Sequence, residues 1–381
     1  MARNVLAEHP AYVVGIGLHP YQRASETTYV TLGLTAVREA VADAGLQWPD
    51  VESAYVGNCR IGMAAGPAML RYMGSTGLAV AQVENALATG STAFRQAVHD
   101  VAAGVVDVCL AVGVDKPDVM GAGPAKAKVR SLADGLIQPF SHFAMLTEQY
   151  MTATGARPEQ IGLVAVKNHR NGALNPYAQR QKVRTLEEVM APPQISGALT
   201  RLQCTPVGEG AAAVIVASAE AIDRLGLDRS RAVRVTASAS RLQEYTPGVN
   251  HDVALTKATT FQAYEQAGIE PHDLDVVEMH DAFTIEELLY LEAMGLCAEG
   301  EAVAHLERGD YDIGGRHAVS ASGGLLAMGH PTGPTGVGQV CEIVRQLRGE
   351  AGPRQHPNAR VGLAHMVGVG AVCLVHVLQK N

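Results

Sequence analysis

The sequence has 381 residues, of which 47% are apolar, and a formal net charge of −8. A chain of this length and composition can bury large cores and suits two domains or two fused repeats. The negative charge and the lack of a basic run argue against nucleic acid or an anionic membrane as the main partner. The first residues lack the apolar core of a signal peptide, and no apolar run has transmembrane length. We therefore expect a globular, cytoplasmic protein.

Six cysteines are scattered along the chain, at positions 59, 109, 204, 297, 341 and 373. None of them forms a CxxC pair, which argues against a zinc site and against a disulfide framework. Free thiols suit a reducing compartment. We expect no metal site and no tightly bound cofactor.

The first part of the chain alternates short apolar runs with segments of helical periodicity. These patterns predict strands at 11–18, 54–57, 78–83 and 106–114, and helices at 30–44 and 88–104. The strand at 106–114 is apolar throughout, as expected for burial on both faces, and the strands at 54–57 and 78–83 are also expected to be buried. Such alternation indicates a parallel or mixed sheet covered by helices.

From about 115 to 206 the pattern changes to polar and Pro-rich pieces mixed with short helical runs. An insertion of this length favours a lid or a binding region. A second series follows, with strands predicted at 209–218, 233–239, 275–279, 361–366 and 371–378, and helices at 256–267 and 285–294.

One histidine, His330, lies in a Gly- and Pro-rich stretch, Ser320 to Gly338. This composition predicts a shaped loop with close backbone approaches. Apolar spacing predicts a helix at 337–347, so the loop would carry His330 to a helix N-terminus, where negative charge is stabilised. The alternative is a Gly-rich turn with an incidental surface histidine.

The two halves of the chain also share a local pattern. Residues 40–51 align without gaps on 263–274, matching Ala40 with Ala263, Ala44 with Ala267, Gly45 with Gly268 and Asp50 with Asp273. In both, a helix ends at Gly, an Asp follows, and a strand comes next. This predicts a duplicated α/β unit.

Three motifs in this order, VENALATGS (83–91), HDAFT (280–284) and SGGLLAMGHPTGPTG (322–336), resemble the thiolase superfamily. The closer likeness is to its sterol-carrier-protein-thiolase and lipid-transfer-protein branch, which includes the large subunits of benzoylsuccinyl-CoA thiolase and of steroid side-chain aldolases. The resemblance implies an α/β fold of two βαβαβαββ halves in five αβαβα layers, with halves at 1–225 (loop domain about 115–206) and 226–381. It also implies a coenzyme A thioester substrate, a dimer or tetramer, and a small zinc-ribbon/OB-fold partner subunit.

The chain departs from the family's pattern at the two positions that hold reactive cysteines in that pattern. The nucleophilic cysteine of the VENxCxxG motif is replaced by Leu87, and the cysteine of the HDCF motif by Ala282. A leucine cannot form an acyl-enzyme. No cysteine occupies the Gly-rich C-terminal motif, and Cys297 and Cys373 fall elsewhere, where a buried apolar role is the more usual one.

By resemblance, His280 and His330 are the catalytic residues that line the pocket of the thioester oxygen, where hydrogen-bond donors stabilise an enolate. Either ring could also act as a general base. Asp281 either orients His280 or caps the following helix. The resemblance assigns substrate binding to Leu87, Ala282, Phe283, Gly329, His365 and Gly368.

Three functions remain open at this point. The first is a thiolase-like enzyme that cleaves a β-ketoacyl-CoA by acyl transfer to coenzyme A without an acyl-cysteine. The second is a retro-aldolase acting on a β-hydroxyacyl-CoA. The third is a non-catalytic subunit that binds acyl-CoA within a thiolase complex.

Overall fold

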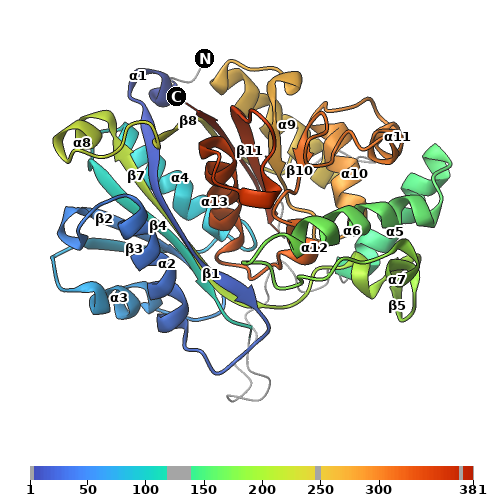
Figure 1. The fold of residues 1–381 in the computed structure, drawn as a ribbon, viewed down its shortest axis with the longest axis horizontal. Helices are drawn as coiled ribbons and strands as arrows, with labels where there is room; N and C mark the ends of the chain where they lie inside the picture. Colours follow the sequence, from blue (N-terminus) through green and yellow to red (C-terminus); the bar gives the residue numbers. More distant parts are fainter. Residues whose placement is uncertain (1–3, 118–138, 245–249, 369–371, 381) are drawn as a thin grey trace.

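Two α/β units with the same strand order make up the molecule (Figure 1). The computed structural model describes residues 4–117, 139–244, 250–368 and 372–380. In the first unit the sheet order is β3-β2-β4-β7-β1, and in the second it is β10-β9-β11-β12-β8. The strands of the first unit are β1 (Ala11–Gln22), β2 (Ser53–Gly57), β3 (Ala79–Val83), β4 (Val108–Asp115) and β7 (Glu209–Ser218). Those of the second are β8 (Val233–Leu242), β9 (Val276–Glu278), β10 (Ala318–Val319), β11 (Val361–Gly368) and β12 (Val372–Lys380).

Each unit contains the same mixture of parallel and antiparallel pairs. Strand β2 runs parallel to β3 and β4, as β9 does to β10 and β11. The later strands pair antiparallel with their neighbours, β7 with β4 and β12 with β11. The units join where Ala11–Val13 of β1 pairs antiparallel with Val233–Val235 of β8. The mixed α/β fold and its duplication, both expected from sequence, are confirmed.

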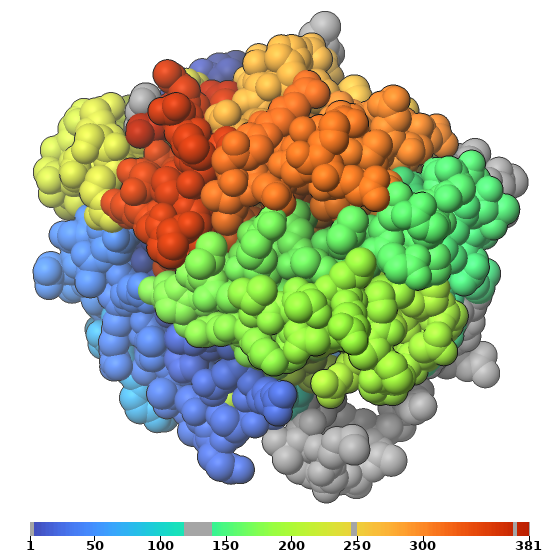
Figure 2. Space-filling model, turned by 45° about the vertical axis from the view of Figure 1, so that its right-hand side comes forward, coloured from blue at the N-terminus to red at the C-terminus, as the bar shows by residue number. Residues whose placement is uncertain are grey.

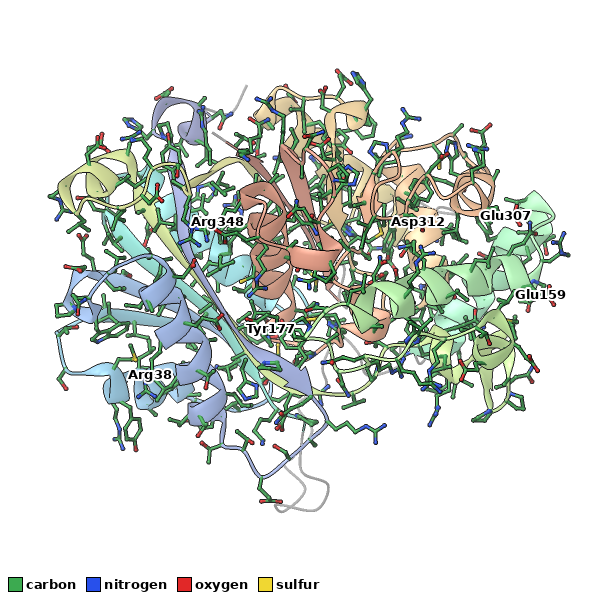
Figure 3. The ribbon with its side chains drawn as sticks, in the orientation of Figure 1. Arg38, Glu159, Tyr177, Glu307, Asp312 and Arg348 are labelled. Carbon is green, nitrogen blue, oxygen red and sulfur yellow. The ribbon has the colours of Figure 1, made fainter. Side chains whose placement is uncertain are left out.

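Helices form a central layer and two outer layers around these strands. Helices α4 (Thr89–Ala102) and α13 (Thr335–Arg348) share one core with strands of both units. Helix α2 (Tyr29–Asp43) covers the outer face of the first unit. Helices α9 (His251–Ala267) and α10 (Thr284–Ala293) cover the outer face of the second. The Arg348 guanidinium, labelled in Figure 3, joins the central to the outer layer by an ion pair of 2.8 Å with Asp43.

The repeated sequence pattern forms the same corner twice. Helices α2 and α9 both end at a glycine of positive φ, Gly45 and Gly268. In each corner a short 3₁₀ turn follows, Trp48–Asp50 in one and Pro271–Asp273 in the other. Asp50 accepts from the backbone N–H of Gln47 at 2.7 Å, and Asp273 from that of Glu270 at 2.8 Å.

The segment between β4 and β7 crosses the face of the molecule as a band between the two units (Figure 2). It contains α5 (Pro139–Thr154), α6 (Pro158–Ala173), α7 (Leu186–Met190) and the hairpin β5–β6 (Gln194–Ser196, Leu199–Thr200). The expectation of only short helical runs is wrong, because α5 and α6 have 16 residues each. Pro158 stands at the first helical position of α6, where proline is tolerated. Part of the predicted insertion, 118–138, lies outside the described residues.

Other expectations need correction. The predicted strand at 78–83 exists as β3, but it is mostly exposed because it is a sheet edge that pairs only with β2 among the described residues. Helix α9 begins five residues before the predicted start, at Asn250-capped His251. Five short helices were not expected: α1 (Val5–Glu8), α3 (Ala65–Leu70), α8 (Ala219–Arg224), α11 (Ala302–Glu307) and α12 (Gly324–Ala327). In the described ranges, no helix has the length and apolar character needed to cross a bilayer.

Candidate active site

The N-termini of the two central helices meet, and the candidate site forms around them. A Cβ on Gly90 of α4 would lie 2.4 Å from the carbonyl oxygen of Gly333, and one on Gly336 of α13 would lie 2.3 Å from Ser91 Oγ. Only glycine permits this approach. Since both helices have 14 residues, their positive ends converge on one region, which favours negative charge there.

His330 lies in the loop before α13, and its hydrogen bonds define which ring nitrogen is open. Its Nδ1 is 2.9 Å from Thr335 Oγ1, whose own hydroxyl donates to the Pro331 carbonyl at 2.6 Å. The Nδ1–H therefore donates to Thr335, and Nε2 retains its lone pair. Among the described residues this buried Nε2 has no partner. Burial, and then the neighbouring His280 and Arg60, lower the pKa of His330 well below its usual value. The ring is thus neutral at physiological pH and presents a base.

His280 follows β9 and is 4% exposed. Its Nδ1 lies 2.8 Å from Glu286 Oε1 in the first turn of α10. Glu286 also accepts from the backbone N–H of Phe283 at 2.9 Å and from the hydroxyl of Tyr290 at 3.3 Å. A carboxylate oxygen accepts, so the His280 Nδ1 carries the hydrogen of this contact and its Nε2 is the free position. That buried Nε2 also lacks a partner within the described chain.

The two imidazole rings are neighbours, with centroids 5.1 Å apart and planes at 85°. Both histidines were expected in one pocket from the sequence, and the structure brings them together. Glu286 was missed, although its spacing from His280 in the first turn of the predicted helix could have suggested it.

Asp281 serves neither role expected of it. It accepts from the backbone N–H of Leu325 at 2.6 Å, from Ser320 Oγ at 2.9 Å and from Asn168 Nδ2 at 2.7 Å. It therefore fastens the Gly-rich loop to helix α6. The residue that contacts the His280 ring, and that also accepts from a backbone N–H at the start of α10, is Glu286.

Leu87 lies in the turn that leads into α4, behind Ala86, whose φ of 48° is unusual for a non-glycine residue. Its half-buried side chain packs in a small apolar cluster with Met366, Leu374 and Val372 of the C-terminal hairpin. The position of the family nucleophile is thus filled by an apolar contact between the units.

A thiol does reach this turn, from a cysteine that the sequence did not single out. Cys59 Sγ donates to the Ala86 carbonyl at 3.0 Å and lies 3.2 Å from Thr89 Oγ1. Burial, and to a smaller extent Asp115, raise the pKa of Cys59 to about 11, so it is a neutral thiol at pH 7. The pKa of Cys297 is raised by burial to about 11 and that of Cys373 to about 12, so both are neutral thiols at pH 7.

The other expected substrate-binding residues surround the histidines at different depths. Phe283 stacks on Phe143 with centroids 4.6 Å apart, and the Ala282 carbonyl accepts from the backbone N–H of Thr205 at 2.8 Å. His365 is fully buried behind His280, and its Nε2 is 3.1 Å from Thr256 Oγ1. Burial lowers the pKa of His365 to about 3, which makes it a neutral support.

At the edge of the site, two glycines allow the backbone to approach neighbouring segments closely. A Cβ on Gly329, the residue before His330, would be 2.9 Å from Gln179 Oε1. A Cβ on Gly368 would be 3.3 Å from the Asn85 carbonyl of the Leu87 turn. In the described part of the chain, no group of three or more His, Cys, Asp or Glu is arranged to hold a metal ion.

Comparison with known proteins identifies the family of the chain. Residues 12–220 match the thiolase N-terminal domain, and residues 244–380 match the thiolase C-terminal domain-like family. The chain belongs to the thiolase family. The resemblance inferred from the three motifs is therefore confirmed, and this thiolase-family chain differs from the nucleophile pattern at Leu87.

Several relatives of this thiolase-family chain carry informative names. The benzoylsuccinyl-CoA thiolase subunit BbsB of Thauera aromatica is 37% identical over 372 residues, covering 95% of this chain and 96% of the relative. Human sterol carrier protein 2 is 35% identical over 396 residues, covering 97% of this chain and 72% of the relative. The Ltp2-ChsH2(DUF35) aldolase has a TM-score of 0.83 at 26% identity, with 98% of each chain covered. Human mitochondrial 3-ketoacyl-CoA thiolase, at 16% identity and a TM-score of 0.74, shares the fold.

Proposed function

We propose that this thiolase-like acyl-CoA enzyme cleaves a carbon–carbon bond in a β-hydroxyacyl-CoA thioester by a retro-aldol reaction. The observation that carries the proposal is the pair of open Nε2 atoms, on His280 and His330, beside a nucleophile position occupied by Leu87. Such a site can move a proton and stabilise an enolate, but it cannot form an acyl-cysteine.

The steps follow from the hydrogen-bond pattern. His330 Nε2, which has a lone pair, takes the proton of the β-hydroxyl group. As the β-carbonyl forms, the bond between Cα and Cβ breaks, and its electron pair moves into the thioester enolate. His280, with hydrogens on both ring nitrogens, donates from Nε2 to the enolate oxygen, while Glu286 accepts from Nδ1. The proton that His330 has taken then passes to Cα, which releases a shortened acyl-CoA and an aldehyde or ketone and restores the base.

The missing nucleophile favours this reaction over thiolysis. With an acyl-cysteine, the first product, a shortened acyl-CoA, leaves before free coenzyme A enters. One binding site therefore serves both ligands in turn. Without it, a thiolase has to bind the β-ketoacyl-CoA and a second coenzyme A at once. A retro-aldol reaction needs only one ligand. The likeness to the Ltp2-ChsH2(DUF35) aldolase supports the same conclusion.

Acyl transfer from a β-ketoacyl-CoA to coenzyme A is the second candidate, and the 37% identity to a benzoylsuccinyl-CoA thiolase subunit favours it. A non-catalytic acyl-CoA-binding subunit is the third. In all three cases we propose a small zinc-ribbon/OB-fold partner, because one relative is named as a subunit and the name of the other pairs it with a DUF35 protein.

The test is incubation of the purified protein, alone and co-purified with its genomic neighbours, with β-hydroxyacyl-CoA and β-ketoacyl-CoA thioesters. Products are followed by mass spectrometry with coenzyme A supplied or withheld. We expect cleavage of the hydroxy substrate without added coenzyme A, no acyl adduct on the protein, and a loss of about a hundredfold or more for His330→Ala. Cleavage of only the keto substrate, and only with coenzyme A, would instead establish the second candidate. Binding without any cleavage would establish the third.

A further inference from the structure

Helix α6 lies beside α10 and α12 (Figure 1), and one of its faces is polar although it is buried. Lys167, Asn168 and Asn171 lie on this face, and each is at most 3% exposed. Lysine is almost never fully buried unless it is paired. The burial of Lys167 therefore indicates a role inside the protein that a surface lysine could not have.

The ammonium group of Lys167 uses all three of its hydrogens. Its Nζ donates to Glu287 Oε2 at 3.3 Å and lies 3.1 Å from Glu287 Oε1. It also donates to Asn168 Oδ1 at 2.7 Å and to the Val319 carbonyl at 2.8 Å. Glu287, on α10, is fully buried, so this is an internal ion pair.

A second buried carboxyl group, that of Asp281, lies next to this pair. Asn168 Nδ2 donates to Asp281 Oδ2 at 2.7 Å and to Glu287 Oε2 at 3.1 Å, so one amide group joins both acidic side chains. Burial, and then Glu287, raise the pKa of Asp281 well above its usual value, while Lys167 acts to lower it. Among the described residues, Lys167 is the only cation that forms an ion pair with either acidic side chain.

The two acidic residues are the sequence neighbours of the candidate site. Asp281 directly follows His280, and Glu287 directly follows Glu286, whose carboxylate contacts the His280 ring. Asp281 also accepts from a backbone N–H in the first turn of α12 at 2.6 Å, and α12 leads to His330. The buried acidic pair is thus connected to the segments that carry both histidines.

We propose that Lys167 is a positioning residue for the proton transfers at His280 and His330. Its charge offsets that of Asp281 and Glu287, which hold the two histidine segments against α6. Removing one member of a buried ion pair leaves an unpaired charge and is far more costly than replacing both members. Without the lysine, the segments would therefore separate from α6. The effect on turnover rests on the proposed function, whereas the effect on geometry does not.

The experiment is a double-mutant cycle of Lys167→Met, Glu287→Gln and the double variant that combines them. Lys182→Met is the matched control, because Lys182 is an exposed lysine of the same segment that pairs with Glu188 at 3.2 Å. Steady-state kinetics with a β-hydroxyacyl-CoA thioester measure kcat and KM separately. Crystal structures measure the separation of the two catalytic histidine rings, whose centroids here are 5.1 Å apart. Urea unfolding verifies that each variant is folded.

We expect kcat to fall about a hundredfold in Lys167→Met, with KM nearly unchanged, and the two rings to move apart. The double variant should regain kcat to within about tenfold of wild type and restore the ring separation. Glu287→Gln alone leaves Lys167 with Asp281 and should have a smaller effect than Lys167→Met. The control should match wild type. If Lys167→Met alone does not fold, a folded and active double variant supports the proposal equally.

Wild-type kcat and ring separation in Lys167→Met would overturn the proposal and leave the proposed function standing. Losses that add in the double variant, or a failure of both variants to fold, would also overturn it, because Lys167 would then act by packing and not by its charge. If wild type itself does not cleave the thioester, but the rings separate in Lys167→Met and return in the double variant, the positioning role is supported and the proposed function is overturned.

Discussion

Leu87 shows how one residue changes the chemistry available to this site. Its side chain packs against the buried cluster of Ala88, Met366 and Leu374, so the turn that carries a nucleophile in other family members here forms part of an apolar wall. Full burial of a leucine is worth about 1.5–3 kcal/mol, and a half-buried one contributes less.

We expect Leu87→Cys not to raise turnover of the native substrate, because the retro-aldol route does not use a thiol and the wall loses contact area. Leu87→Met, which retains apolar volume, is the control and should remain near wild-type activity. Steady-state kinetics of both variants measure this. A large gain for Leu87→Cys would mean that the site is a thiolase site lacking only its nucleophile.

Glu286 is expected to act through His280 as a positioning residue. Glu286→Gln keeps an acceptor near Nδ1 but removes the charge, so kcat should fall by about tenfold or more with little change in KM. Steady-state kinetics measure both parameters. In wild type the acid limb of the pH–rate profile should lie below about 6.5, because burial, then His280 and Arg60, lower the pKa of His330. An unchanged kcat in Glu286→Gln would remove Glu286 from the mechanism.

The sequence was sufficient to predict that two histidines come together, but not what holds them. Adjacent residues at the end of a strand point to opposite faces, so Asp281 could not support the ring of its neighbour His280. Glu286 reaches that ring because the chain turns into α10, and this geometry is visible only in three dimensions. Cys59 was missed for a similar reason, since its thiol contacts a turn that is distant in sequence.

At the scale of elements, Asp115 fixes the loop of His330 to the first unit. It lies at the end of β4, is 1% exposed, and accepts from the backbone N–H of Cys59 and of Gly333, each at 3.0 Å. Asp115→Asn would turn an amide N–H₂ either toward these two donors, which share Oδ2, or toward the backbone N–H of Arg60, which donates to Oδ1 at 3.0 Å. We expect a loss of about 1–3 kcal/mol in the free energy of unfolding, with reduced turnover. Urea unfolding measures it, and Asp107→Asn, a change in a surface ion pair with Arg224, should be nearly neutral. Equal losses in both would contradict the role of Asp115.

Strand β9 carries a second buried carboxyl group, Glu278, which accepts from Ser322 N–H at 2.9 Å and Ser322 Oγ at 2.6 Å. Burial, and then the nearby Glu342, raise the pKa of Glu278 to about 8. A raised folded-state pKa gives stability that is present below the unfolded pKa of about 4.3 and is lost as pH rises toward 8. Melting temperatures are measured at pH 6 and pH 9. The melting temperature of Glu278→Gln, relative to that of wild type, should therefore be higher at pH 9 than at pH 6. A difference that is independent of pH would contradict this.

Most elements were predictable because their periodicity is strong, and the repeated corner revealed the duplication. The helices α5 and α6 were underestimated because polar and Pro-rich pieces elsewhere between residues 115 and 206 dominated the pattern of that segment. The exposure of β3 could not be read from composition, since an apolar run does not say whether a strand is central or at an edge.

For the whole molecule, the exposed edge strand β3 predicts self-association. Long, unprotected sheet edges pair with other chains unless a partner covers them. We expect at least a dimer by light scattering coupled to size exclusion, and Ala81→Lys on the exposed face of β3 should shift it toward monomer. A wild-type monomer at micromolar concentration would contradict the prediction.

The contact between the N-termini of α4 and α13 has a consequence for how such a site can change. The second residue of each helix, Gly90 or Gly336, approaches the third residue of the other, Val337 or Ser91. This reciprocity is what a two-fold axis produces in a symmetric dimer, here within one chain. The loops before the two helices are counterparts, and they carry Leu87 and His330 respectively. Duplication gives a site on such an axis two equivalent loops, one from each unit. The reaction needs a reactive residue from only one of them. One loop can therefore exchange its reactive residue while its counterpart continues to hold the substrate, so that a new reaction arises by mutation of a single loop.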